Sequence, residues 1–132
     1  MGPDRAYYFY RRALSLEQLE RFAEAAVEFG NLLVHDSSAQ AEIVERSDAL
    51  AEQGHLAGAS AYLDALEQNG YQGPALTTRR LRILVTQSSW AKAEEISREA
   101  LNQDPEDRQL QSIRAEVLQR LAGEKGEVQQ SG

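Results

Sequence analysis

Four arginine residues recur at a constant spacing of 34 residues along the chain, namely Arg12, Arg46, Arg80 and Arg114. A guanidinium group stays charged and binds carboxylates or phosphates through paired hydrogen bonds, so the column has two interpretations. In the first, each stem packs over apolar surface and each head reaches water or a carboxylate of a neighbouring helix. The candidate carboxylates are Glu24, Glu28, Glu94 and Glu95. In the second, the arginines present a ladder of anion sites along one edge. We favour the first interpretation and keep the second open.

The residues that could support catalysis do not form a catalytic pattern. His35 and His55 each lack a second histidine or a carboxylate three or four residues further on, which a helical metal motif requires. Neighbouring glutamates such as Glu94 and Glu95 are typical of solvated helix faces. The chain contains no glycine-rich phosphate loop and no G-x-S-x-G motif. We therefore expect no enzyme, no metal site and no cofactor.

The spacing of apolar residues predicts seven helices that position these side chains. The first runs from about Asp4 to Leu19 and the second from Phe22 to about His35. Gly54 separates the third helix from the fourth, and Pro74 opens the fifth. The sixth begins at Trp90, and the seventh follows the turn at 104–107. The stripes predicted to be buried are Phe9/Ala13/Leu16, Phe22/Ala25/Phe29/Leu32, Ile43/Ser47/Leu50, Leu56/Ala59/Leu63/Leu66, Leu81/Leu84/Val85, Trp90/Ala93/Ser97/Ala100 and Ala115/Leu118/Leu121.

Length, charge and cysteine content exclude several classes of protein. The chain has 132 residues, a net charge of −7 and no cysteine. The negative charge opposes binding to nucleic acid, whose affinity rests on phosphate neutralisation, so we expect no nucleic-acid partner. No apolar run reaches the length of a membrane span, and no linker of glycine and proline divides the chain. We therefore expect one soluble domain with no direct membrane insertion, in the cytoplasm or periplasm, including as the soluble domain of a membrane-associated protein.

The periodic columns resemble the tetratricopeptide repeat (TPR) family, whose unit is a 34-residue helical hairpin. The small residue of the first helix is matched by Ala13, Ser47 and Ala115, with Leu81 as a bulky exception. The glycine of the inner turn is matched at Gly54 and replaced by Glu20 and Ser88. The large residue and the alanine that open the second helix are matched by Phe22 and Ala25, Leu56 and Ala59, and Trp90 and Ala93. The closing proline is matched by Pro105.

This resemblance implies an all-α fold, a right-handed α-solenoid of three helical hairpins plus a C-terminal capping helix. The TPR-like domain then covers residues 1–122, with repeats at about 6–39, 40–73 and 74–107 and the capping helix at 108–122. Residues 123–132 are polar, bear glycine and lack a period, which predicts a disordered tail.

TPR arrays resemble one another in lining a concave groove with the outward residues of each first helix, and helical geometry selects the same positions here. The predicted partner-binding residues are Tyr7, Tyr10, Arg11, Leu14, Val44, Glu45, Asp48, Thr78, Arg79 and Arg82. Their charges alternate in sign along the groove, which suits an extended peptide or a single helix. Of the positions with which TPR clamps grip the C-terminal carboxylate of chaperone tails, only Arg79 matches, so that mode is disfavoured.

The run from Tyr7 to Tyr10 is the densest aromatic cluster in the chain. Helical geometry sends its four residues to different faces, so only part of the run can be core. The remainder either caps the array or contacts an upstream repeat or a partner subunit.

The leading functional prediction is a non-catalytic protein–protein interaction module, an adaptor that binds a peptide or helix of a partner in its groove. Through the resemblance, the context expected is a bacterial envelope assembly such as exopolysaccharide export, pilus assembly or secretion. The alternatives are a self-assembly module that uses the aromatic first helix, and a secretion chaperone.

Overall fold

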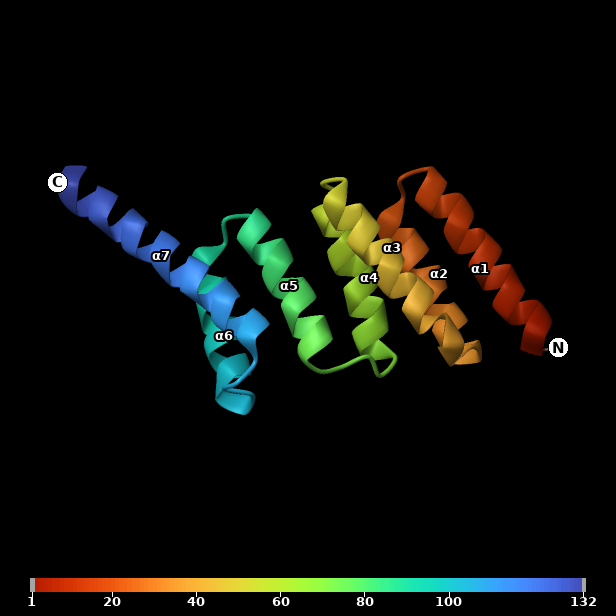
Figure 1. Cartoon of the computed structure of the whole chain (residues 1–132). Helices are drawn as coiled ribbons and strands as arrows, with labels where there is room; N and C mark the ends of the chain where they lie inside the picture. Colours follow the sequence, from red (N-terminus) through yellow and green to blue (C-terminus); the bar gives the residue numbers. More distant parts are fainter. Residues whose placement is uncertain (1, 132) are drawn as a thin grey trace. The chain divides into compact units, whose positions relative to one another are not determined.

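The computed structural model describes the backbone of residues 2–131 and the side chains of residues 5–124. Within residues 2–131 all regular structure is helical, so the predicted all-α class is confirmed (Figure 1). The helices are α1 (Gly2–Gln18), α2 (Phe22–His35), the 3-10 helix η1 (Ser37–Ala39), α3 (Gln40–Glu52), α4 (Leu56–Gln68), α5 (Pro74–Thr86), α6 (Trp90–Gln103) and α7 (Arg108–Ser131).

The chain divides into two compact units, unit 1 (Met1–Gln72) and unit 2 (Gly73–Gly132). The division falls in the connection between α4 and α5, where Gly70 and Gly73 both have positive φ. Two glycines in conformations that other residues disfavour make this connection a natural boundary.

Unit 1 consists of two helical hairpins, α1 with α2 and α3 with α4, and α2 packs against α4. The α2–α4 contact is close because Gly58 lacks a side chain: a Cβ atom there would lie 2.8 Å from the Phe22 ring. Phe29 and Tyr62 meet edge to face in the same layer, with ring centroids 5.1 Å apart. The stripes predicted for α3 and for most of α2 and α4 are buried, so unit 1 has a continuous apolar core.

The turn inside each hairpin has one geometry that recurs every 34 residues. Glu20, Gly54 and Ser88 all have positive φ, between 57° and 88°. The residue after each of them donates a backbone hydrogen bond to a carbonyl five residues earlier, as in Arg21 to Leu16 and His55 to Leu50. These are Schellman turns, which normally favour glycine at the left-handed position. The helix ends therefore repeat with the sequence period even where the glycine is replaced.

Unit 2 consists of the α5–α6 hairpin and α7, which packs against both of these helices. Its core is formed by Leu81, Ala93, Leu110 and Val117. The stripe predicted for α7 is wrong at two of its three positions, because Ala115 and Leu118 are exposed and only Leu121 is partly buried. The inward face of α7 is therefore set by its contacts with α5 and α6 and not by the column that contains Ala115 and Leu118.

The backbone of α7 continues in helical form to Ser131, past residue 122, where the sequence predicted the end of the capping helix. Glutamate, lysine and glutamine dominate the segment after Gly123, and these residues have high intrinsic helix propensity. The predicted disordered tail at 123–132 thus overlaps the end of α7. The side chains after residue 124, and Gly132 itself, lie outside the described residues. Among the described residues, no helix combines the length and apolarity needed to cross a membrane.

Candidate functional site

The clearest candidate site in unit 1 is a cleft of about 500 Å³ between α1 and the α2–α3 connection. Its lining is formed by Ala6, Tyr7, Tyr10, Leu32, Asp36, Ser38, Ala39 and Glu42, and we call it the tyrosine cleft. Tyr7 and Tyr10 stand one turn apart on α1, which directs both rings to one side of the helix. The cleft therefore combines two aromatic rings with a small apolar floor and two carboxylates.

The far wall of the tyrosine cleft is shaped by the turn that starts η1. The Asp36 carboxylate accepts hydrogen bonds from the backbone N–H of Ser38, at 3.0 Å, and from the Ser38 hydroxyl. This is an Asx-type capping arrangement, which fixes the backbone where α2 gives way to α3. Asp36 and Ser38 therefore both cap the helix end and line the cleft.

Glu42, at the edge of the cleft, belongs to a polar network centred on Arg46. The Arg46 guanidinium donates to Glu42 at 3.0 Å and to Glu17 at 2.5 Å. Tyr62 donates its hydroxyl hydrogen to the other oxygen of Glu17 at 2.9 Å. Because Glu17, Arg46 and Tyr62 come from α1, α3 and α4, this Arg46 network ties the two hairpins of unit 1 together.

The network also sets the charge states of its members. Burial and the hydrogen bond to Glu17 raise the pKa of Tyr62 well above its usual value, so the phenol stays protonated as a donor. Burial alone would lower the pKa of Arg46, but the hydrogen bond to Glu42 and the charge of Glu17 outweigh it and the pKa is raised. The Tyr10 hydroxyl acts in the same direction on Arg46, which links the cleft to the network.

The arginine column follows the interpretation that was favoured from the sequence. Arg12 pairs with Glu28 at 3.4 Å and Arg114 with Glu94 at 3.2 Å, both among the predicted partners. Arg46 pairs with Glu17 and Glu42, which were not predicted as its partners. Arg80 also has an interaction partner. The guanidinium groups of Arg12, Arg46 and Arg114 are therefore matched by carboxylates of the same chain.

The predicted partner-binding residues fall into three groups. Tyr7 and Tyr10 line the tyrosine cleft. In unit 1 Arg11 and Glu45 are exposed, while Leu14, Val44 and Asp48 are half-buried; in unit 2 Arg82 is exposed and Arg79 is half-buried. Thr78 differs from the prediction, because it is only 5% exposed. It stands one turn before Leu81 and shares the face that Leu81 buries, so its hydroxyl is not presented to a partner.

Most of the cleft lining was not identified from the sequence. Leu32 was assigned to the core stripe, and Asp36, Ser38 and Glu42 were not among the predicted partner-binding residues. Glu42 stands one turn before Arg46, and a carboxylate at the (i, i+4) spacing is a usual partner of a helical arginine. This spacing was the sequence signal that could have identified Glu42 as a partner of Arg46.

The two histidines lie against aromatic rings. His35 stacks on Phe9 with ring centroids 5.5 Å apart, and His55 lies 4.9 Å from Phe22. His55 Nε2 is also 4.0 Å from a Glu20 carboxylate oxygen. Among the described side chains, no group of three or more histidine, cysteine, aspartate or glutamate residues is arranged to hold a metal ion.

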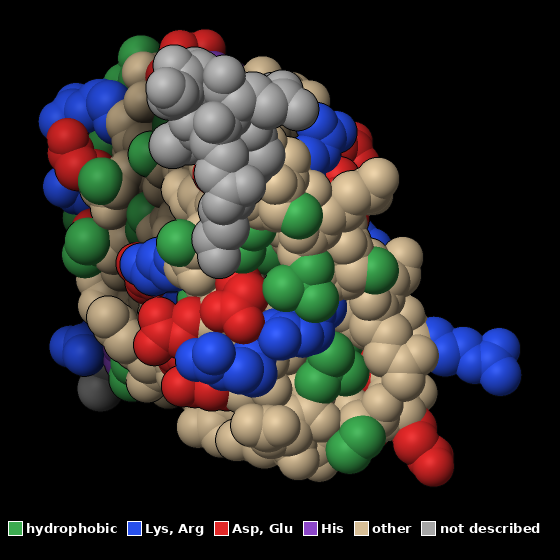
Figure 2. Space-filling view, turned by 90° about the vertical axis from the view of Figure 1, so that its left-hand side faces the viewer, with side chains coloured by type: hydrophobic (Ala, Val, Ile, Leu, Met, Phe, Trp, Pro, Cys, Tyr) green, Lys and Arg blue, Asp and Glu red, His purple; other side chains and the backbone are tan. Residues whose placement is uncertain are grey.

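Charges of both signs are mixed on the molecular face shown in Figure 2, where acidic and basic side chains lie next to one another and hydrophobic side chains are interspersed. Comparison of this chain with protein-family models, with curated proteins and with solved structures found no match.

Proposed function

We propose that this protein is a non-catalytic interaction module of the TPR type, whose hairpins form an α-solenoid, and that its tyrosine cleft binds a peptide segment of a partner. The observation that carries the proposal is the cleft itself, in which Tyr7 and Tyr10 face Leu32 and two carboxylates within about 500 Å³. Tyrosine is enriched among the residues that dominate binding energies at protein interfaces. The setting proposed for such an adaptor is a bacterial envelope assembly.

The 34-residue recurrence supports the TPR part of this proposal. Three helical hairpins carry the same Schellman turn at Glu20, Gly54 and Ser88. Two of the second helices, α2 and α6, also end alike: Asp36 and Asp104 each donate a backbone hydrogen bond to a carbonyl four residues earlier. A fixed period in the turn inside each hairpin is the pattern of repeat proteins.

The lining of the tyrosine cleft indicates the chemistry of the segment it would take. Ala6, Leu32 and Ala39 offer an apolar floor, which suits one aliphatic or aromatic anchor side chain. The lining contains the carboxylates of Asp36 and Glu42 and no positive charge. Glu42 already pairs with Arg46, so Asp36 supplies the charge that favours a basic residue beside the anchor. The proposed ligand is therefore a short segment with a large apolar residue next to lysine or arginine.

The cleft is also held in shape before any ligand binds. Its α1 wall and its α3 wall are joined through the Arg46 network, and its third wall is fixed by the Asp36 cap. A preorganised cleft loses less conformational entropy on binding than a mobile one.

The experiment that tests the proposal is selection from a displayed library of random short peptides, followed by calorimetric titration of the enriched sequences. We expect enriched peptides to carry an apolar anchor beside a basic residue, and Tyr10→Ala to weaken their binding about tenfold or more. Ser15→Ala is the matched control, because Ser15 is exposed on α1, lies outside the cleft lining and is not among the predicted partner-binding residues. This variant should leave the affinity within about twofold. Peptides that bind wild type and Tyr10→Ala equally would contradict the proposal.

Self-assembly remains a second candidate because of two exposed rings on α1. Tyr7 and Tyr8 are 64% and 56% exposed, which is high for large aromatic side chains. Tyr8 does not line the tyrosine cleft, so a substitution of Tyr8 tests self-association without changing the cleft lining. If α1 mediates self-association, the sedimentation coefficient should rise with protein concentration and Tyr8→Ser should abolish that rise; a constant monomer would rule this candidate out.

A further inference from the structure

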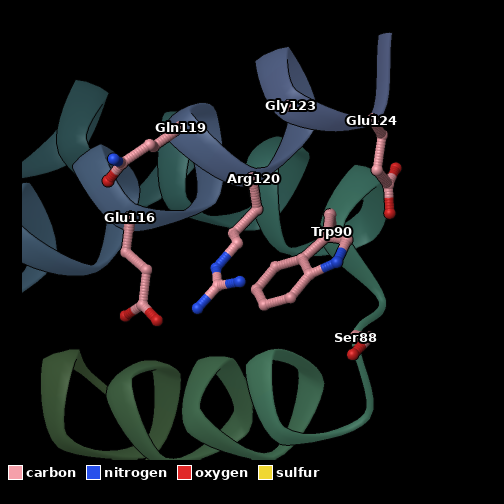
Figure 3. Close-up of a pocket in the computed structure, with 7 residues that line it drawn as sticks. All are labelled: Ser88, Trp90, Glu116, Gln119, Arg120, Gly123 and Glu124. Atoms are coloured by element: carbon pink, nitrogen blue, oxygen red, sulfur yellow. The ribbon is translucent and has the colours of Figure 1, made fainter. Parts of the chain in front are cut away.

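A second and larger cleft lies within unit 2, between the start of α6 and α7, with a volume of about 910 Å³ (Figure 3). Its lining residues are Ser88, Trp90, Glu116, Gln119, Arg120, Gly123 and Glu124, and we call it the tryptophan cleft. Trp90 is the first residue of α6, and the last five residues of the lining belong to α7.

The α7 wall of this cleft has a regular charge pattern. Glu116, Arg120 and Glu124 follow one another at intervals of four residues, so their side chains leave α7 on one face. Figure 3 shows the Arg120 side chain between Glu116 and Trp90. The lining thus contains two carboxylates, one guanidinium and one indole, with a net charge of −1 from the residues of the lining.

Arg120 covers the aromatic surface of the cleft. Its guanidinium carbon lies 5.7 Å from the centroid of the Trp90 ring, within the range of a cation–π interaction. Arg120 is itself exposed, while Trp90 is partly buried and packs against the core of unit 2. The indole is therefore fixed by the fold, whereas the arginine is a surface side chain that another cation can displace.

We propose that the tryptophan cleft binds an arginine side chain of a partner peptide, and that Arg120 is an intramolecular competitor for the same position. Indole is the strongest cation–π acceptor among side chains, and a planar guanidinium both stacks on it and hydrogen-bonds to carboxylates. Glu116 and Glu124 supply those carboxylates on either side of Arg120 in the helix. A cleft of about 910 Å³ leaves room for the rest of the incoming side chain and its backbone.

This proposal is independent of the tyrosine cleft, because the two clefts share no residue and belong to different units. A negative result for one cleft therefore does not count against the binding proposed for the other. The readout is also specific, since Trp90 is the only tryptophan in the chain and its fluorescence reports on this cleft alone.

The test is a fluorescence titration of the full chain with a capped pentapeptide that has arginine at its centre and alanine elsewhere. The same peptide with glutamine at its centre is the control. We expect a saturable change in Trp90 fluorescence with the arginine peptide and none with the glutamine peptide. Arg120→Ala should bind the arginine peptide about two- to fivefold more tightly, because a competing cation–π contact of ordinary strength is removed.

The double variant Glu116→Gln/Glu124→Gln should bind the arginine peptide several-fold more weakly, and its fold can be checked by circular dichroism. An Arg120→Ala protein that binds no better than wild type would overturn the competitor role. Equal responses to the arginine and glutamine peptides would overturn the site.

Discussion

The two units use the same position of the 34-residue register in different ways. In unit 1, Arg46 is held by Glu17 of α1 and Glu42 of α3 and lies 6.0 Å from the Phe29 ring centroid, so it joins both hairpins. In unit 2, Arg114 donates to the Glu94 carboxylate, to the Glu94 carbonyl and to the Ser97 hydroxyl, so it joins α7 to α6 alone. Arg46 and Arg114 therefore both join neighbouring helices, and the helices that each one joins differ between the units.

The cores of the two units also differ, in the number and size of the side chains that they bury. Unit 1 buries Phe29, Ile43, Tyr62, Leu63 and Leu66 almost completely. The core of unit 2 is built on the smaller set of Leu81, Ala93, Leu110 and Val117. Because the apolar area removed from water dominates folding stability, we expect unit 1 to be the more stable unit.

The largest expected effect on stability comes from removing the Arg46 side chain, which joins the two hairpins of unit 1. Arg46→Leu leaves the Glu17 and Glu42 carboxylates without their common partner, and should lower the free energy of unfolding by about 2 kcal/mol. Arg114→Leu should cost less, since Glu94 keeps Arg98 as a partner at 3.4 Å. Urea denaturation followed by circular dichroism measures both changes.

Arg21→Leu is the matched control for Arg46→Leu, since both side chains of the Arg21–Glu24 ion pair are more than half exposed, compared with 28% for Arg46. An exposed ion pair contributes about 1 kcal/mol or less, so Arg21→Leu should change stability little. If Arg46→Leu and Arg21→Leu have equal effects, the Arg46 network is not what holds the hairpins together.

The next effect contrasts two helical glycines, one in each unit. Gly58→Ala should lower the free energy of unfolding by about 1 to 2 kcal/mol, because the new Cβ meets Phe22 and the gain in helix propensity is smaller. Gly123→Ala meets nothing within 4 Å and should be neutral or stabilising. Thermal unfolding of the two variants decides this; a stabilised Gly58→Ala would mean that α2 and α4 are not closely packed.

A third test uses pH. The folded state raises the pKa of Tyr62, so its stabilising effect is complete below about pH 10, the pKa of a free tyrosine, and is lost as pH rises above it. Above that pH the wild type should lose at most about 1.4 kcal/mol per pH unit relative to Tyr62→Phe. Urea denaturation of both proteins across that pH range measures the difference, and parallel stability curves would show that Tyr62 is not held in its neutral form.

The smallest expected effect is a gain in stability at the recurrent turn. Ser88 has φ 57°, and replacing it with glycine should relieve about 1 kcal/mol of left-handed backbone strain. Gly54→Ser, at the equivalent turn in unit 1, should cost a similar amount. Thermal unfolding of both variants compares the two turns, and a Ser88→Gly protein no more stable than wild type would indicate an unstrained turn.

The sequence was most informative where local rules and the repeat coincide. The starts at Phe22, Pro74 and Trp90 were predicted to the residue, because a turn signal precedes each apolar stripe. The burial of Ala13, Ser47 and Leu81 likewise followed from one column. Where each second helix packs on a first helix at a constant sequence interval, the 34-residue period is enough to predict which residues are buried.

Prediction failed where packing was decided by contacts outside the period. Val117 is buried and Ala115 exposed because no further second helix constrains α7 in the described chain. The tyrosine cleft was only half anticipated, since Asp36 and Glu42 approach Tyr7 and Tyr10 from segments far along the chain.

The most direct test of the central claim is to map the peptide-binding surface by NMR, with an enriched peptide added to the labelled protein. Binding in the tyrosine cleft predicts amide shift changes concentrated at Ala6, Tyr7, Tyr10, Leu32 and residues 36–42, and their loss in Tyr10→Ala. Shift changes confined to residues outside this set, or unchanged in Tyr10→Ala, would contradict the account.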